Sequence, residues 1–377
     1  MLTNNENKRI VFIDLMRAYA ILMMVQGHLI ETLIAPEFRD DSNYLYLIWN
    51  FMRGVTAPVF FFASGSIFAF LLMKQEDKGL GFKNPRARKG FKRTIFLLAL
   101  GYALQITPGF YIFITTGNTN RLNWFIVSHV LQVIAIALLM IVITYLIFRN
   151  VKPFLYIPYI IAGNLIFLFF PDFLEINFNA FLPKIIANYF TTANGSAFTV
   201  VPWAGFSMLG AAYGVFLFQN KDLVNNRKFF YLIILSGILL HIYSGNLLNS
   251  FYYILGWDNL KLLFENNFLY FRMGQVLIIA GLFGLLAIRI RIPKIVTIIG
   301  SETLAIYFWH SVLIYGSITT YGLSQHFKHT LNPWQCVGLA LMAEALLIVI
   351  AFYTYKIKRW LKKRRKTRTL ITTQQSI

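Results

Sequence analysis

The sequence predicts an all-α, polytopic integral membrane protein, and three observations support this class. Hydrophobic residues make up 57% of the 377 residues and charged residues only 13%, about half of the charged share found in soluble domains. Long apolar runs recur from one end of the chain to the other, and a membrane helix needs about 20 such residues. Lys and Arg gather in alternate connections between these runs, which is typical of the cytoplasmic loops of membrane proteins.

The apolar runs predict about ten membrane helices in a single transmembrane domain over residues 1–358. The predicted spans cover residues 10–34, 45–73, 92–115, 123–148, 153–170, 198–218, 228–248, 268–288, 295–317 and 336–357. Asp14, Arg17 and His28 interrupt the first run, which is also longer than the apolar core of a signal peptide, at about 7–15 residues. We therefore interpret this run as the first membrane helix and not as a cleaved signal peptide.

The positive charges predict that the N- and C-termini are both cytoplasmic. With the N-terminus inside, the cytoplasmic segments contain 27 of the 35 Lys and Arg residues, and the outside loops contain five. The formal net charge of +20 is thus mainly a sign of topology. Residues 359–377 form a basic cytoplasmic tail, which we expect to contact anionic membrane lipids and not nucleic acid. We expect a multi-pass protein of a bacterial inner membrane or plasma membrane.

Ionisable residues are costly inside a bilayer and usually face a cavity or the bundle interior. Eleven lie in the predicted spans: Asp14, Arg17, His28, Glu31, Arg53, His129, His241, Arg272, Glu302, His310 and Glu344. Arg17 and His28 are eleven residues apart, so they share one helix face and are separated by about 16 Å along its axis. Glu31 follows His28 by three residues, a spacing at which it can orient the imidazole or hold its proton. This face has an anion-binding group near the cytosol and a general base near the outside.

Depth along the spans predicts a polar layer in the outer half of the membrane. The layer contains His28, Glu31, Arg53, His129, Arg272 and His310. Each of these residues also has a structural interpretation, because intramembrane His often bonds between helices and Arg can extend to the interface. For His241, Glu302 and Glu344 we favour the structural interpretation, with Glu302 capping or kinking the ninth span. Ser64 and Ser66 are possible helpers in catalysis, but we favour a role in helix packing.

Five segments follow known motifs in the expected order. They are KRIVFIDLMRAYAILMMVQGH, PVFFFASGSIFAFLL, ARKGFKRTIFLLALGYAL, SHVLQVIAIALL and SETLAIYFWHSVLI. Together they resemble the transmembrane acyltransferase superfamily, which includes the acyltransferase-3 and heparan-α-glucosaminide N-acetyltransferase-like branches. The first segment has the Arg–ten residues–His spacing of this superfamily, although Arg17-Ala18 stands where Arg-Gly is usual.

The resemblance implies an acyltransferase that moves an acyl group, often acetyl, from cytosolic acyl-CoA to a carbohydrate-type acceptor at the outer face. The acceptor atom would be a hydroxyl or an amine. In this sequence the donor would be bound by Arg17, Lys89, Lys92 and Arg93. Catalysis would involve His28, as base or as acylated nucleophile, with Glu31 and His310, while Arg53, His129 and Arg272 would bind the acceptor.

Two other functions remain open from the residues alone. A proton-coupled transporter would use the buried His and Glu residues as a relay, although the sequence has no repeated halves of the kind common in transporters. A non-catalytic membrane partner protein would need none of these groups. Metal chemistry is not expected, because Cys336 is the only cysteine and no Cys/His pattern has the spacing of metal ligands.

Overall fold

The computed structural model describes residues 10–75, 77, 79, 81–106, 113–117, 123–317 and 320–374, and within these residues the fold is all-α, as predicted. The α-helices are α1 (Val11–Leu33), α2 (Tyr44–Met73), α3 (Pro85–Leu104), α5 (Asn123–Ile126), α6 (Val130–Phe148), α7 (Tyr156–Leu168), α8 (Phe170–Glu175), α9 (Lys184–Ala187), α10 (Val200–Gln219), α11 (Arg227–Leu255), α12 (Asp258–Glu265), α13 (Phe268–Arg289), α14 (Lys294–Ser301), α15 (Thr303–Tyr315), α16 (Leu323–Phe327) and α17 (Pro333–Gln374). Short 3-10 turns are η1 (Pro36–Phe38), η2 (Gly81–Lys83), η4 (Lys152–Phe154), η5 (Phe178–Ala180) and η6 (Lys221–Asn225). Extended pairing in the described part is limited to one bridge between Ile34 and Leu331.

The number of membrane spans is lower than the ten predicted. In the described part of the chain, seven helices are long and apolar enough to cross a membrane, or eight if α14 and α15 count as one bent span. The predicted span 153–170 is wrong in length because α7 has only 13 residues. The predicted span 92–115 corresponds to α3, whose 20 residues begin with the basic segment PRARKGFKR. The end of that span falls partly on residues 107–112, outside the described residues.

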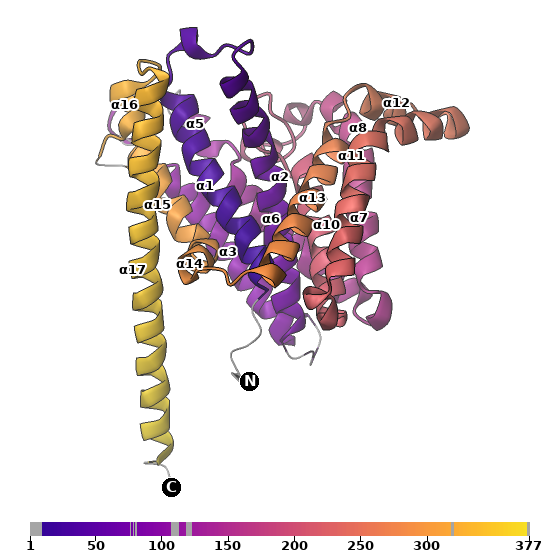
Figure 1. The fold of residues 1–377 in the computed structure, drawn as a ribbon, viewed down its shortest axis with the longest axis vertical. Coiled ribbons are helices and arrows are strands. Elements are labelled where there is room, and N and C mark those ends of the chain that lie inside the picture. Colours follow the sequence, from indigo (N-terminus) through magenta and orange to yellow (C-terminus); the bar gives the residue numbers. More distant parts are fainter. Residues whose placement is uncertain are drawn as a thin grey trace.

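The long helices form one bundle with α1 near its centre (Figure 1). α1 packs against α2, α13, α14 and α17, while α2 packs most extensively against α10, and α11 against α13. The first residue of α1 and the last turns of α17 point to the same end of the bundle (Figure 1). This agrees with termini on one side of the membrane, and the cytoplasmic orientation stays a prediction.

The C-terminal helix α17 continues without a break through the predicted basic tail. Its 42 residues correspond to a length of about 63 Å, and its last turns extend well past the rest of the bundle (Figure 1). The boundary predicted at residues 358 and 359 therefore lies inside one helix.

Close approach of the backbones holds α2 against α10. A Cβ added to Gly65 would lie 2.0 Å from the carbonyl oxygen of Ser207, and one added to Gly210 would lie 2.1 Å from that of Phe62. Ser207 Oγ also donates to the carbonyl oxygen of Phe61 at 3.1 Å. Ser66 is buried and donates to its own helix at Phe62 O, so its predicted packing role is confirmed. Small residues allow this approach, as is common between membrane helices.

We expect Gly210→Ala to destabilise the protein, because the new methyl group forces α10 away from the α2 backbone. Overpacking of this kind costs about 1–3 kcal/mol. Gly338→Ala on α17 is the matched control, because a Cβ there meets no atom within 4 Å. Thermal unfolding of both variants in detergent measures the difference, and equal midpoints would contradict a tight α2–α10 contact.

Candidate active site

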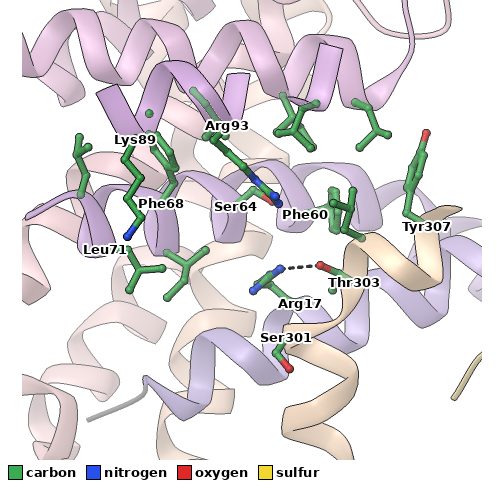
Figure 2. Close-up of a pocket in the computed structure, with 18 of the residues that line it drawn as sticks. Arg17, Phe60, Ser64, Phe68, Leu71, Lys89, Arg93, Ser301, Thr303 and Tyr307 are labelled. Atoms are coloured by element: carbon green, nitrogen blue, oxygen red, sulfur yellow. Dashed lines mark hydrogen bonds between the residues drawn. The ribbon is translucent and has the colours of Figure 1, made fainter. Parts of the chain in front are cut away.

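A cavity of about 400 Å³, here called the inner cavity, opens between α1, α2, α3, α6 and the α14–α15 bend. Its polar lining residues are Arg17, Ser64, Gln75, Lys89, Arg93, Ser301, Thr303 and Tyr307. Figure 2 shows the guanidinium groups of Arg17 and Arg93 directed toward one another across the cavity, with the Lys89 amino group further along. Arg17 Nη2 donates to Thr303 Oγ1 at 2.6 Å. Three cations in one cavity can bind an anionic group.

Local sequence explains how α3 presents these cations. Pro85 occupies the first turn, and the Asn84 side chain caps the helix by accepting from the backbone N–H of Arg86 at 2.9 Å. Arg86 itself donates to the backbone oxygens of Gln75 and Met73 and to Tyr145 Oη, so it fixes the α2–α3 connection. Lys89 and Arg93 follow at i+3 and i+7 and line the inner cavity.

Asp77 stabilises the same connection from outside the membrane helices. It lies 4.0 Å from Arg86 and 3.6 Å from Arg149, and it accepts from Asn84 Nδ2 at 2.8 Å. Burial alone would raise the pKa of Asp77, but hydrogen bonds from Tyr145 and Asn84 and the two arginines together lower it below its usual value.

Arg86 therefore has a structural role in the α2–α3 connection. The predicted donor residue Lys92 is exposed on the same helix and is not part of the inner cavity wall.

The ninth predicted span is broken at Glu302, which confirms the interpretation that this residue caps or kinks the helix. α14 and α15 meet there at 71°. The Glu302 carboxylate accepts from Lys358 Nζ of α17 at 2.6 Å, and Gly300 packs on the backbone of Asp14. The bend directs the N-terminus of α15, which has a partial positive charge, to the inner cavity at Thr303.

A second cavity of about 290 Å³, here called the His28 chamber, lies further along α1 and α2. His28 and Glu31 of α1, Arg53 and Thr56 of α2 and a largely apolar remainder line it. Phe60 is in the wall of this chamber and also in the wall of the inner cavity. Arg17 and His28 therefore face two cavities that meet at one side chain, which agrees with their predicted common helix face.

His28 is surrounded by residues of α15. The rings of His28 and His310 are stacked with centroids 5.6 Å apart, and Tyr315 Oη lies 3.4 Å from His28 Nδ1. His310 is 1% exposed, and its Nδ1 lies 3.3 Å from the carbonyl oxygen of Ile306. A carbonyl only accepts, so this nitrogen has the proton in the hydrogen-bonded form. The structure thus brings together two histidines that were predicted only to lie at a similar depth.

Glu31 is bound by two arginines and not primarily by His28. Its Oε2 accepts from Arg53 Nη1, and its Oε1 accepts from Arg39 Nη1 at 3.1 Å. Arg39 also donates to the carbonyl oxygen of Glu31 and contacts His329 Nδ1 at 3.0 Å. Arg39 and His329 lie between the predicted spans, and nothing in their local sequence indicates that these segments fold over α1.

An open cavity of about 580 Å³, here called the outer vestibule, continues from Glu31 to the surface. Its lining includes Glu31, Tyr315, Arg39, Trp124, Gln325 and Lys328. Glu31 lines both the vestibule and the His28 chamber. Tyr315 also lines the vestibule, and its hydroxyl contacts His28. The chamber therefore has the inner cavity on one side and the vestibule on the other.

The last two predicted site residues, His129 and Arg272, lie in different surroundings. His129 occupies the N-cap position of α6 directly before Val130 of the chamber wall, and its ring centroid is 5.0 Å from that of Trp124 in the vestibule. Arg272 lies in the α2–α13 contact, where it donates to Gln275 Oε1 at 2.9 Å and packs closely on Gly54. The structure brings His129, but not Arg272, close to the chamber.

Cations and histidines that line neighbouring cavities define a membrane-embedded protein with an internal polar site. The family model of the acyltransferase-3 domain, described as "Acyltransferase domain", matches residues 10–354, so the chain belongs to this family of membrane-bound acyltransferases. No curated protein and no solved structure matches the chain significantly. The match confirms the predicted family, the enzyme class and the multi-pass membrane location, and it favours the acyltransferase over the transporter and the non-catalytic partner protein.

We expect Lys358→Met to destabilise the protein more than Glu302→Gln. Lys358→Met leaves a carboxylate whose side chain is 7% exposed without its cation, whereas Glu302→Gln leaves a cation that is 63% exposed. Loss of the partner of a buried charge costs up to about 3 kcal/mol, and an exposed cation costs little. Unfolding midpoints in detergent measure this asymmetry, with Lys362→Met as the control for loss of an exposed cation. A larger drop for Glu302→Gln would contradict it.

Proposed function

We propose that this acyltransferase takes an acyl group, acetyl in the simplest case, from acyl-CoA on the cytoplasmic side. It transfers the group to a hydroxyl or amine of a carbohydrate-type acceptor at the outer side. The observation that supports this proposal most strongly is the series of inner cavity, His28 chamber and outer vestibule, whose neighbouring members share Phe60 and Glu31. Such a series gives donor and acceptor separate entrances to one histidine.

The inner cavity has the chemistry that a CoA ester requires. Its phosphates need cations and N–H donors, which Arg17, Lys89, Arg93 and the α15 N-terminus supply. Most of the remaining wall is apolar and suits the extended pantetheine arm. Along α1 the distance from Arg17 to His28 is about 16 Å, so the donor would lie lengthwise with its phosphates inside and its thioester toward His28.

In the proposed reaction His28 acts as general base on the acceptor. It removes the acceptor proton while the acceptor oxygen or nitrogen attacks the thioester carbonyl carbon. The C–S bond then breaks, and the leaving thiolate takes the proton back from the imidazolium. In a two-step variant the imidazole nitrogen is acylated first and the acceptor attacks the acyl-histidine. Both variants consume one acyl-CoA and release one CoA thiol.

The neighbours of His28 would support either variant. Tyr315 and His310 hold the imidazole in place through the hydroxyl contact and the ring stack. Arg53 lines the chamber and is held by Glu31, so it is the cation best located to stabilise the oxyanion of the tetrahedral intermediate. Glu31 would hold and partly balance the charge of Arg53, and so would act on His28 only indirectly.

The acceptor would enter through the outer vestibule. Trp124 offers a face for stacking on a sugar ring, and Gln325, Ser324 and Tyr315 offer hydrogen-bonding groups. Of the residues predicted to bind the acceptor, Arg53 and His129 lie next to this route, while the α2–α13 position of Arg272 gives it no part in the proposal.

We expect Arg17→Ala to weaken binding of acetyl-CoA by about 10- to 100-fold, because a hydrogen bond to a charged group contributes about 1.5–3 kcal/mol. Isothermal calorimetry on purified protein in detergent measures this directly. Arg88→Ala is the matched control, since Arg88 is an exposed cation of the same basic segment outside the inner cavity wall. Absence of binding by folded wild type, with acetyl-CoA and with longer acyl-CoAs, would overturn the proposed donor.

We expect His28→Ala to bind acetyl-CoA normally and to lose transfer, with kcat lower by about 10²–10⁴-fold. CoA thiol release in the presence of a membrane-derived carbohydrate fraction measures transfer. His241→Ala is the matched control, because His241 is also in a membrane helix but packs on Phe271 in the α11–α13 contact. Full activity of His28→Ala would rule out the mechanism as written.

A further inference from the structure

We propose that Phe60 is a movable barrier between donor binding and acyl transfer, and that it limits the length of the acyl group. The inference rests on the proposed function and concerns the point where the inner cavity and the His28 chamber meet. Phe60 is part of both walls. On α6 the same boundary falls between Leu131, in the inner cavity wall, and Val130, in the chamber wall. A thioester that travels from Arg17 to His28 must pass this constriction.

Phe60 differs in its packing from the two phenylalanines that follow it. The ring of Phe61 is stacked on Trp203 at 5.6 Å, and the ring of Phe62 contacts Tyr213 at 5.5 Å. Within the described residues, the ring of Phe60 makes no contact with another aromatic ring. Phe60 is 6% exposed but lines both cavities, so a rotation about its side-chain torsions would displace fewer packed atoms than it would for Phe61 or Phe62, whose rings are held by aromatic contacts.

A closed barrier would have a chemical benefit. A thioester beside a general base is open to hydrolysis, in which water attacks the carbonyl carbon, the C–S bond breaks, and a carboxylic acid and CoA thiol are released. Exclusion of water from a reaction site suppresses such side reactions. In its closed position Phe60 separates His28 from water and donor in the inner cavity, and the incoming pantetheine arm would displace the ring only when the phosphates are bound near Arg17.

The barrier also bounds the space for the acyl group. The His28 chamber, at about 290 Å³, must hold the thioester, the acyl chain and the reacting part of the acceptor together. Phe60 and Phe61 contribute bulky walls to this chamber. Removal of the Phe60 ring would join the chamber to the inner cavity and make room for a longer chain.

The experiment measures acceptor-independent CoA release from acetyl-, butyryl- and octanoyl-CoA by the purified full-length protein, together with donor affinity by calorimetry. We expect Phe60→Ala to raise acetyl-CoA hydrolysis on the order of tenfold and the relative rate with octanoyl-CoA by about 10- to 100-fold. The gain should disappear in Phe60→Ala/His28→Ala. Phe60→Trp should bind acetyl-CoA as wild type does but release less CoA.

Phe70→Ala is the matched control, because Phe70 is an aromatic residue of α2 that is as buried as Phe60, packs on Phe218 and lines neither the inner cavity nor the chamber. Phe60→Leu and Phe60→Trp preserve the test if Phe60→Ala does not fold. Wild-type hydrolysis and chain-length preference in Phe60 variants that bind acetyl-CoA normally would overturn the barrier and leave the proposed function intact. Failure of wild type to bind any acyl-CoA would overturn both.

Discussion

The cost of placing charge inside a membrane is the constraint on which this structure depends. Glu31 binds two arginines with its carboxylate, Arg39 through Oε1 and Arg53 through Oε2. The same pairing ties α1 to α2 through Arg53 and to the outer loops through Arg39 and His329. A network that neutralises one carboxylate therefore also determines where the His28 chamber ends and where the outer vestibule begins.

A tight helix contact on one side and a bent helix pair on the other position the residues around this network. Backbone contact between α2 and α10 fixes the helix that supplies Arg53, Phe60 and Ser64. On the opposite side, the 71° bend between α14 and α15 turns a helix N-terminus toward the inner cavity and brings His310 and Tyr315 to His28. Irregular backbone at membrane depth is tolerated where it lines a cavity or is buried in protein, and Glu302 with Lys358 meets that condition here.

Predictions from the sequence were reliable where they depended on the spacing of polar residues along one helix. The spacing of Arg17 and His28 predicted their common face, and the basic segment at the start of α3 contains Lys89 and Arg93, which line the inner cavity. The predicted number of membrane spans was too high. α7 is too short to count as a span, and α3 begins with too many basic residues. The sequence did not indicate contacts between distant segments, such as the pairing of Glu31 with Arg39 and Arg53.

By itself, the sequence determined the all-α membrane class, the family and the common helix face of Arg17 and His28, because hydropathy, motifs and helical periodicity are local properties. Only the tertiary structure decided which polar residues share a cavity. Arg53 and Arg272 are both arginines of the outer half, yet one lines the His28 chamber and the other packs in the α2–α13 contact. The difference comes from helix rotation and from loops that return over α1, which are set by packing between distant segments and leave no local pattern.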